Sequence, residues 1–203
     1  MTGQVPPLRE MLARLIAAPS VSSSQAHLDQ STLGVIEALA QWLEAAGFAV
    51  EVMPVPGHAG KANLIATLGQ GQGGLVLAGH TDTVPFDAHR WNHDPFRLTE
   101  EGGRLYGLGT SDMKSFLALA CEAARGLSAK DLCRPLVILA TADEESSMSA
   151  HARSSSGSRS STRAASEPAG PAPTTSTLSS DLAFSNFSGC QLRRYSSPAV
   201  AFW

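Results

Sequence analysis

The sequence predicts an α/β protein with a mostly parallel sheet and helices on both faces, followed by a disordered tail. Short apolar runs bounded by glycine or proline, such as residues 75–78 and 136–140, are typical of buried strands. Amphipathic segments with helical spacing alternate with such runs, which favours a parallel sheet covered by helices. The composition changes abruptly after Met148, and this change divides the chain into residues 1–148 and 149–203.

Two amphipathic helices are expected near the N-terminus. Residues 7–18 place apolar side chains at helical spacing, and Pro19 is suited to stop that helix. Residues 32–46 repeat the pattern, with Gly47 placed to end the second helix. The Ser-rich segment 19–30 between them is predicted to be a loop.

Three strands are expected next, as neighbours in one sheet. Residues 48–53 alternate as a half-buried strand does, and residues 63–68 and 75–78 follow. Residues 69–74 formally match the Gly-x-Gly-x-x-Gly pattern of dinucleotide sites. A strand follows that pattern where a dinucleotide site needs a helix, so the segment is predicted to be a flexible turn.

The later part of the domain begins with a loop over residues 87–99. The loop carries His89 and His93, which we leave outside the site because a histidine in a polar loop is usually solvated. A short strand is expected at 103–107. An amphipathic helix follows Asp112.

His80 and Asp82 follow directly on the apolar strand 75–78. Open α/β sheets bind their ligands at the carboxyl ends of strands. Side chains two residues apart on an extended chain point the same way, so Asp82 is placed to orient the imidazole of His80.

Three more carboxylates are expected at comparable points of the same sheet. Asp112 opens a helical pattern, and Glu144 and Glu145 follow the strand 136–140. One imidazole together with several carboxylates is a ligand set for a hard or borderline divalent metal. The sequence therefore predicts a metal site at this edge of the sheet.

Four motifs together resemble the zinc aminoacylase, carboxypeptidase and deacylase superfamily. The resemblance covers about residues 5–148, and within the superfamily it is strongest to the bacterial acetylornithine deacetylases. The motifs are GHTDTVPFD at 79–87, Trp91 with DPF at 94–96, LYGLGTSDMK at 105–114 and TADEE at 141–145. The phrases closest to the deacetylases are VPFD, YGLGT and the opening PSVS at 19–22.

The resemblance implies a role for each matched residue. His80 would bind one metal ion, with Asp82 orienting its ring, and Asp112 would bridge two ions. Glu144 would be the general base, and Glu145 would bind the second ion. The cofactors implied are two divalent metal ions, with zinc expected and cobalt as the alternative.

The activity implied is hydrolysis of the small molecule N2-acetylornithine to ornithine and acetate, in arginine biosynthesis. A sibling activity is the first alternative: succinyl-diaminopimelate desuccinylase, or a related aminoacylase or carboxypeptidase. A truncated, non-catalytic fragment is the alternative from another class. Intact family members are expected to be homodimers, and we expect the inserted lid and dimerisation domain to be absent from this sequence. The last His ligand is also expected to be absent, since no histidine follows His151.

Composition argues against other partners. The net charge is -3, and the Lys and Arg residues are scattered, which gives no reason to expect nucleic acid or an anionic membrane as a partner. The N-terminus shows no basic segment followed by an apolar core, and no run has the length of a membrane span. A cytoplasmic location is expected.

The tail from residue 149 onward has a different character. Residues 149–177 contain no Val, Ile, Leu, Met, Phe, Tyr or Trp, so we expect disorder. A natural linker and an Arg/Ser-rich nucleic-acid-binding segment are two interpretations. We favour a third, a reading-frame change near Ser149, because all five Lys or Arg residues of the tail are Arg and its composition is typical of GC-rich DNA read out of frame.

Overall fold

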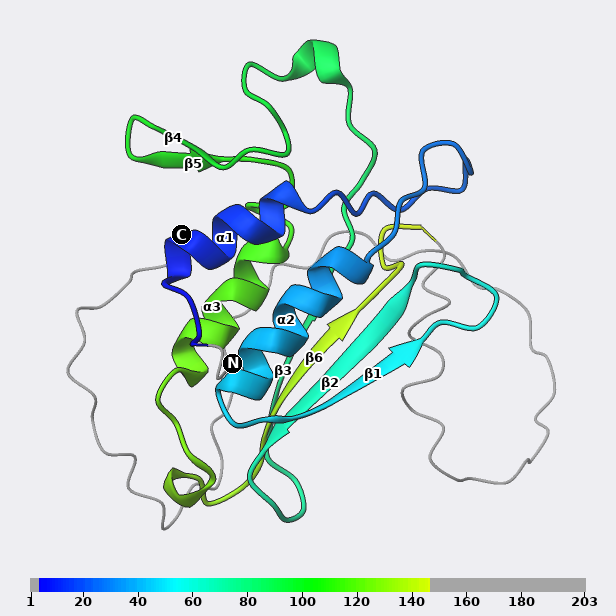
Figure 1. Ribbon diagram of the computed structural model, residues 1–203. Helices are drawn as coiled ribbons and strands as arrows, with labels where there is room; N and C mark the ends of the chain where they lie inside the picture. Colours follow the sequence, from blue (N-terminus) through cyan, green and yellow to red (C-terminus); the bar gives the residue numbers. More distant parts are fainter. Residues whose placement is uncertain (1–3, 147–203) are drawn as a thin grey trace, which may run out of the picture. The chain divides into compact units, whose positions relative to one another are not determined.

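The computed structural model describes residues 4–146, which form three α-helices, a four-stranded sheet and a small hairpin (Figure 1). The predictions of disorder over 149–203 and of a boundary at Met148 lie outside the described residues. The elements are α1 (Leu8–Ala17), α2 (Leu33–Ala45), β1 (Ala49–Pro54), β2 (Ala62–Leu68), β3 (Leu75–His80), η1 (Ala88–Arg90), β4 (Thr99–Glu101), β5 (Arg104–Tyr106), α3 (Lys114–Ala124), η2 (Ala129–Asp131) and β6 (Leu136–Thr141).

The main sheet has the strand order β1-β2-β6-β3, and its strand directions differ from the prediction. The α/β class is confirmed. However, β1–β2 and β2–β6 are antiparallel, and only β3–β6 is parallel, so the prediction of a mostly parallel sheet does not hold for these strands. The connections explain this. Residues 55–61 join β1 to β2 as a hairpin, which makes the pair antiparallel, whereas α3 lies between β3 and β6 and allows a parallel crossover.

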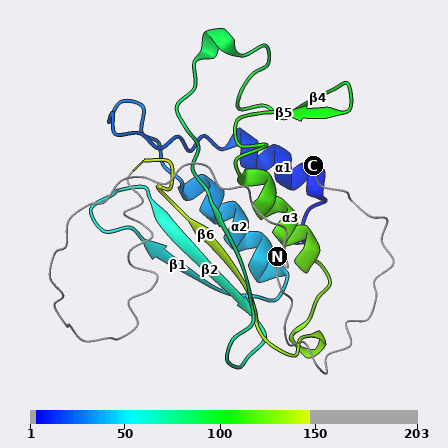
Figure 2. The same ribbon diagram turned by 180° about the vertical axis from the view of Figure 1, so that it is seen from behind.

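The three α-helices pack together on one face of this sheet (Figures 1 and 2). Leu64 on β2 and Ile138 on β6 point to the helices and are fully buried. Ile65 and Val137, their neighbours on the opposite face, are only partly buried. Helices on both faces are therefore not seen in the part of the chain that the structure describes. None of the helices within residues 4–146 has the length and apolar character that crossing a bilayer requires.

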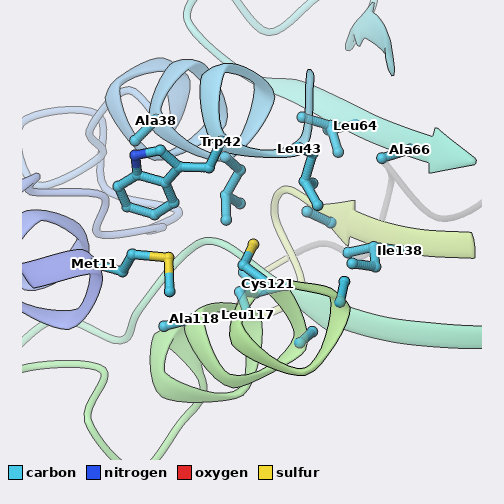
Figure 3. Close-up of a cluster of buried hydrophobic side chains, with 14 of the residues drawn as sticks. Met11, Ala38, Trp42, Leu43, Leu64, Ala66, Leu117, Ala118, Cys121 and Ile138 are labelled. Atoms are coloured by element: carbon cyan, nitrogen blue, oxygen red, sulfur yellow. The ribbon is translucent and has the colours of Figure 1, made fainter. Parts of the chain in front are cut away.

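The core lies between the helices and this face of the sheet. Figure 3 shows Met11 of α1, Trp42 of α2 and Leu117 of α3 meeting there. Each large apolar side chain that is fully buried contributes roughly 1.5–3 kcal/mol to stability. Cys121 lies on the apolar face of α3, and burial raises the pKa of its thiol to about 12. This thiol is therefore a core group and not a reactive one.

The helix ends follow the predicted signals. The second helix, α2, ends where Gly47 adopts a φ of 87°, and the N–H of Phe48 then donates to the carbonyl of Leu43. The Gly-rich segment 69–74 is a turn between β2 and β3, as predicted.

The parallel pairing of β3 with β6 positions the site. His80 and Thr141 are register partners, so the chain leaves both strands at the same edge of the sheet. Gly79 allows β3 to lie close to α3, since a Cβ there would lie 2.9 Å from Cδ1 of Phe116. The residues that follow His80 and Thr141 are thereby brought together.

Candidate metal centre

His80 is a buried histidine whose two ring nitrogens face different groups. Nδ1 lies 3.0 Å from the backbone carbonyl oxygen of Asp82 and 3.4 Å from its carboxylate. A carbonyl oxygen only accepts hydrogen bonds, so Nδ1 carries a proton. Nε2 lies 3.0 Å from Oδ1 of Asp112 and 3.9 Å from Oε2 of Glu144. Without a metal, the protonated ring donates from Nε2 to Asp112, and loss of that proton leaves the Nε2 lone pair directed toward the carboxylates, as a metal-binding histidine requires.

The carboxylate of Asp82 is fully buried and accepts several hydrogen bonds. The backbone N–H groups of Glu144 and Glu145 donate to its two oxygens at 3.3 and 3.1 Å. The side chains of His80 and Ser22 also bond to it. Asp82 therefore contacts the His80 ring and in addition fixes the backbone that carries both glutamates.

Asp112 lies in the tight turn before α3, and its side chain is 74% exposed. Lys114, two residues later, is fully buried, and its ammonium donates to the carbonyls of Leu15 and Ala18 at 3.0 and 2.7 Å. These carbonyls lie at the C-terminal end of α1, where that of Leu15 also accepts the backbone N–H of Ala18 at 3.4 Å. Lys114 therefore fastens the Asp112 turn to α1.

Glu144 and Glu145 follow the end of β6 on a sharply turned backbone. Asp143 between them and the strand has a φ of 66°, a left-handed conformation that is uncommon for a residue with a side chain. The side-chain oxygen of Asn63 accepts the N–H of Ala142 at 2.9 Å and fixes the exit from the strand. The turn brings both glutamates back over His80.

Ligand atoms of His80, Glu144 and Glu145 lie within 4.8 Å of one another. Asp112 lies 3.0 Å from Nε2 of His80, the nitrogen that also faces Glu144. The structure therefore brings the predicted residues together at the carboxyl ends of β3 and β6. A further ligand carboxylate or histidine beyond residue 148 would lie outside the described residues.

The charges around His80 perturb each other. Burial by itself lowers the pKa of His80, but hydrogen bonds to Asp82 and Asp112 outweigh it and raise the pKa to about 9. Burial favours the neutral form of Asp82, yet its hydrogen bonds to His80, Ser22 and the two backbone N–H groups hold its pKa below the ordinary value. Partial burial raises the pKa of Glu145.

Sequence reasoning missed three supporting residues. Ser22 lies in the PSVS phrase, which served only as a point of resemblance, and nothing in it indicates a contact with Asp82. Asn63 and Lys114 read only as parts of a strand and a helix. His93, which the sequence left outside the site, pairs with Glu101 at 3.1 Å and is not one of the three clustered ligand residues.

Comparison with known proteins connects this site to a family. Residues 76–174 match the sequence model of peptidase family M20/M25/M40. Acetylornithine deacetylase of Proteus mirabilis (strain HI4320) is 55% identical over 148 residues, which is 73% of this chain and 38% of that protein. The chain thus spans well under half the length of this relative. The predicted resemblance to the acetylornithine deacetylases is confirmed over this part.

Two solved structures have a similar fold. Human carnosine dipeptidase 1 matches with a TM-score of 0.58 and 22% identity, over 66% of this chain and 31% of that one. A dipeptidase of Saccharomyces cerevisiae matches with a TM-score of 0.53 and 20% identity, over 70% of this chain and 33% of that one. Identities this low support the shared fold only.

Proposed function

We propose, from the similarity of residues 76–174 to peptidase family M20/M25/M40, that this chain is the N-terminal portion of a metal-dependent amide hydrolase. The similarity to an acetylornithine deacetylase makes N2-acetylornithine the proposed substrate, with ornithine and acetate as products. The observation that carries the proposal is the convergence of His80, Glu144 and Glu145 at one edge of the sheet. Arginine biosynthesis in the cytoplasm, predicted from the sequence, is the proposed setting.

The donor atoms of the site fit zinc, with cobalt as the alternative. An imidazole nitrogen and carboxylate oxygens are ordinary ligands of both metals. His80 Nε2 and a carboxylate oxygen of Glu145 would each hold an ion, and Asp112 would bridge the two. When bound, the ions lower the pKa of a water molecule and polarise the amide carbonyl.

The other side chains of the site handle protons and orientation. Asp82 keeps the proton of His80 on Nδ1, so that Nε2 is free to bind. Glu144 would take a proton from the attacking water on its carboxylate and return it to the nitrogen of the leaving amine. Asp82 holds the backbone N–H groups of Glu144 and Glu145, so both side chains extend from a fixed backbone beside His80.

Two alternatives remain proposals of lower rank. A sibling such as succinyl-diaminopimelate desuccinylase, or a related aminoacylase or carboxypeptidase, would use the same metal site with a different substrate. A truncated, non-catalytic fragment is the second, with residues 1–148 as an incomplete catalytic domain and 149–203 as a tail read from a shifted frame. The coding DNA across codons 140 to 160, read in all three frames, tests the frame change directly.

A chimera tests the catalytic proposal. The 148 aligned residues of this chain replace their counterparts in the Proteus mirabilis acetylornithine deacetylase, which supplies the rest of the enzyme. We expect the chimera with zinc to hydrolyse N2-acetylornithine faster than N-succinyl-diaminopimelate, and the same chimera with Glu144→Gln to lose this activity. A folded, zinc-loaded chimera that hydrolyses neither amide would overturn the proposal.

A further inference from the structure

Lys61, just before β2, is a lysine buried close to the site. Its side chain is 1% exposed, and its ammonium lies 2.9 Å from Oδ1 of Asp29 and 2.8 Å from Oγ of Ser22. Lysine is almost never buried unless it is paired, because removing its charge from water is costly. Asp29, whose side chain is 34% exposed, supplies the opposite charge. The second contact, to Ser22, leads toward the candidate metal centre.

The hydrogen bonds through Ser22 can run in only one direction. An ammonium group donates and never accepts, so Ser22 Oγ accepts from Lys61. The backbone N–H of Ser22 donates to the carbonyl of Thr83 at 2.9 Å, which places Ser22 beside Asp82. The Ser22 hydroxyl proton is then left to donate to the carboxylate of Asp82. Asp29, Lys61, Ser22 and Asp82 thus form a chain of hydrogen bonds with a fixed polarity.

Asp82, the last residue of this chain of hydrogen bonds, contacts the residues of the candidate metal centre. Asp82 has no exposed surface and accepts the backbone N–H groups of Glu144 and Glu145, while it orients His80. Loss of the Ser22 proton would leave a lone pair of a buried anion without a donor. Such a group costs free energy and rearranges to recover a partner. The contacts of Asp82 with His80, Glu144 and Glu145 would then weaken.

We propose that Lys61 and Ser22 are positioning residues for the metal centre: Lys61 directs the Ser22 hydroxyl onto Asp82, and Asp82 thereby keeps His80, Glu144 and Glu145 in place. The part of this proposal that concerns metal binding rests on the proposed function. The part that concerns the backbone of the two glutamates does not, because it follows from the metal-free hydrogen bonds.

The first test needs no metal. Amide hydrogen exchange is measured at Glu144 and Glu145 in the full 203-residue chain treated with a chelator, for wild type, Ser22→Ala and Lys61→Met. Both variants are expected to exchange these two amides about tenfold faster, while amides of α2 are unchanged. Lys130→Met, at an exposed lysine, is the matched control and should leave all of them unchanged. Unchanged exchange at Glu144 and Glu145 in Ser22→Ala would overturn the proposal. If Lys61→Met does not fold, the result for Ser22→Ala is sufficient by itself.

The second test measures the affinity of the same chains for Zn²⁺, by competition with a chromophoric chelator. Ser22→Ala and Lys61→Met should each bind zinc about tenfold more weakly, as other partners of metal ligands do when removed. If Lys61 acts through Ser22, the double variant binds no more weakly than Ser22→Ala alone. Fully additive losses would contradict this serial action, because they would show that Lys61 acts on the fold independently.

The two tests separate this proposal from the proposed function. A wild-type chain that binds no zinc, but whose Glu144 and Glu145 amides depend on Ser22, supports the positioning chain and contradicts the metal site. A wild-type chain that binds zinc with an affinity unaffected by either variant, and with unchanged amide exchange, supports the metal site and overturns the positioning chain.

Discussion

The backbone N–H of Glu145 donates to Oδ2 of Asp82 at 3.1 Å. This hydrogen bond joins the two segments that follow two different strands of the sheet. Asp82 follows β3, and Glu145 follows β6, the parallel neighbour of β3. The same carboxylate orients His80. One buried anion therefore connects the two halves of the candidate metal centre, and the consequences of changing it can be measured.

Replacing Asp82 by Asn should weaken zinc binding by about 10–100-fold, as the loss of a partner of a metal ligand usually does. An amide has one oxygen and one NH₂ group, so it cannot accept from both glutamate N–H groups as the carboxylate does. Isothermal titration of the chain with Zn²⁺ measures the change. Asp87→Asn, at an exposed residue of the following loop, is the control, and an equal loss in both variants would contradict the role of Asp82.

Glu144 and Glu145 should respond differently to the same substitution. Glu145→Gln removes a proposed metal ligand and is expected to lower zinc affinity by at least about tenfold. Glu144→Gln removes the proposed base and should leave zinc affinity nearly unchanged, while the chimera described above loses hydrolysis. Chelator competition and an acetate-release assay check the two readouts. The assignment is reversed if Glu144→Gln loses zinc and Glu145→Gln keeps it.

The pKa of His80 predicts a pH-dependent stability for the metal-free chain. Because the folded-state pKa is raised from 6.5 to about 9, the folded state binds the proton more tightly than the unfolded state. This contribution to stability is fully present below pH 6.5 and is lost as the pH rises through 9.

Urea unfolding with a chelator present, at several pH values, measures the contribution as a difference. The free energy of unfolding of wild type minus that of His80→Gln should shrink between pH 6 and 9.5. Taking this difference removes effects common to both chains, such as that of Lys114, whose pKa burial lowers to about 8. A difference that stays constant or grows with pH would contradict the hydrogen bonds assigned to His80.

Gly109→Ala should destabilise the fold by about 1–3 kcal/mol and displace the Asp112 turn. The glycine has a φ of 94°, and a Cβ there would lie 2.9 Å from Cδ of Lys114. Lys114 cannot move aside without breaking its hydrogen bonds to Leu15 and Ala18. Thermal melting and zinc titration measure the two effects.

Gly57→Ala separates the contact from the backbone strain. Gly57 has a similar φ of 82°, but a Cβ there meets nothing within 4 Å. It should therefore cost stability through its backbone conformation and leave zinc affinity unchanged. Equal effects of the two substitutions on zinc affinity would argue against close packing of Lys114 on the Asp112 turn.

The sequence was informative wherever a local pattern decides the structure. The apolar runs 75–78 and 136–140 predicted strands that in the structure extend to His80 and Thr141, and the spacing of His80 and Asp82 predicted their contact. Strand direction was less accessible, because it depends on which strands become neighbours and not on any one segment. The insertion of β6 between β2 and β3 pairs residues about 60 to 75 positions apart in the chain.

The supporting side chains were not predictable for a related reason. Ser22, Asn63 and Lys61 are polar residues without a motif of their own. Each makes its supporting contact with a residue that is distant in sequence. Lys61 and Ser22, for example, are 39 residues apart. Only the folded chain shows that these contacts converge on Asp82 and on the strand end beyond it.

The most direct test of the metal centre is the binding of Zn²⁺ to the purified 203-residue chain, compared with its His80→Ala variant. Equilibrium dialysis against zinc, with elemental analysis of the protein, gives both stoichiometry and affinity. The proposed site predicts bound zinc in the wild-type chain that His80→Ala loses, with the folded state retained. Absence of bound zinc in the wild type, or an equal amount in both chains, would contradict the proposal that these residues form a metal site.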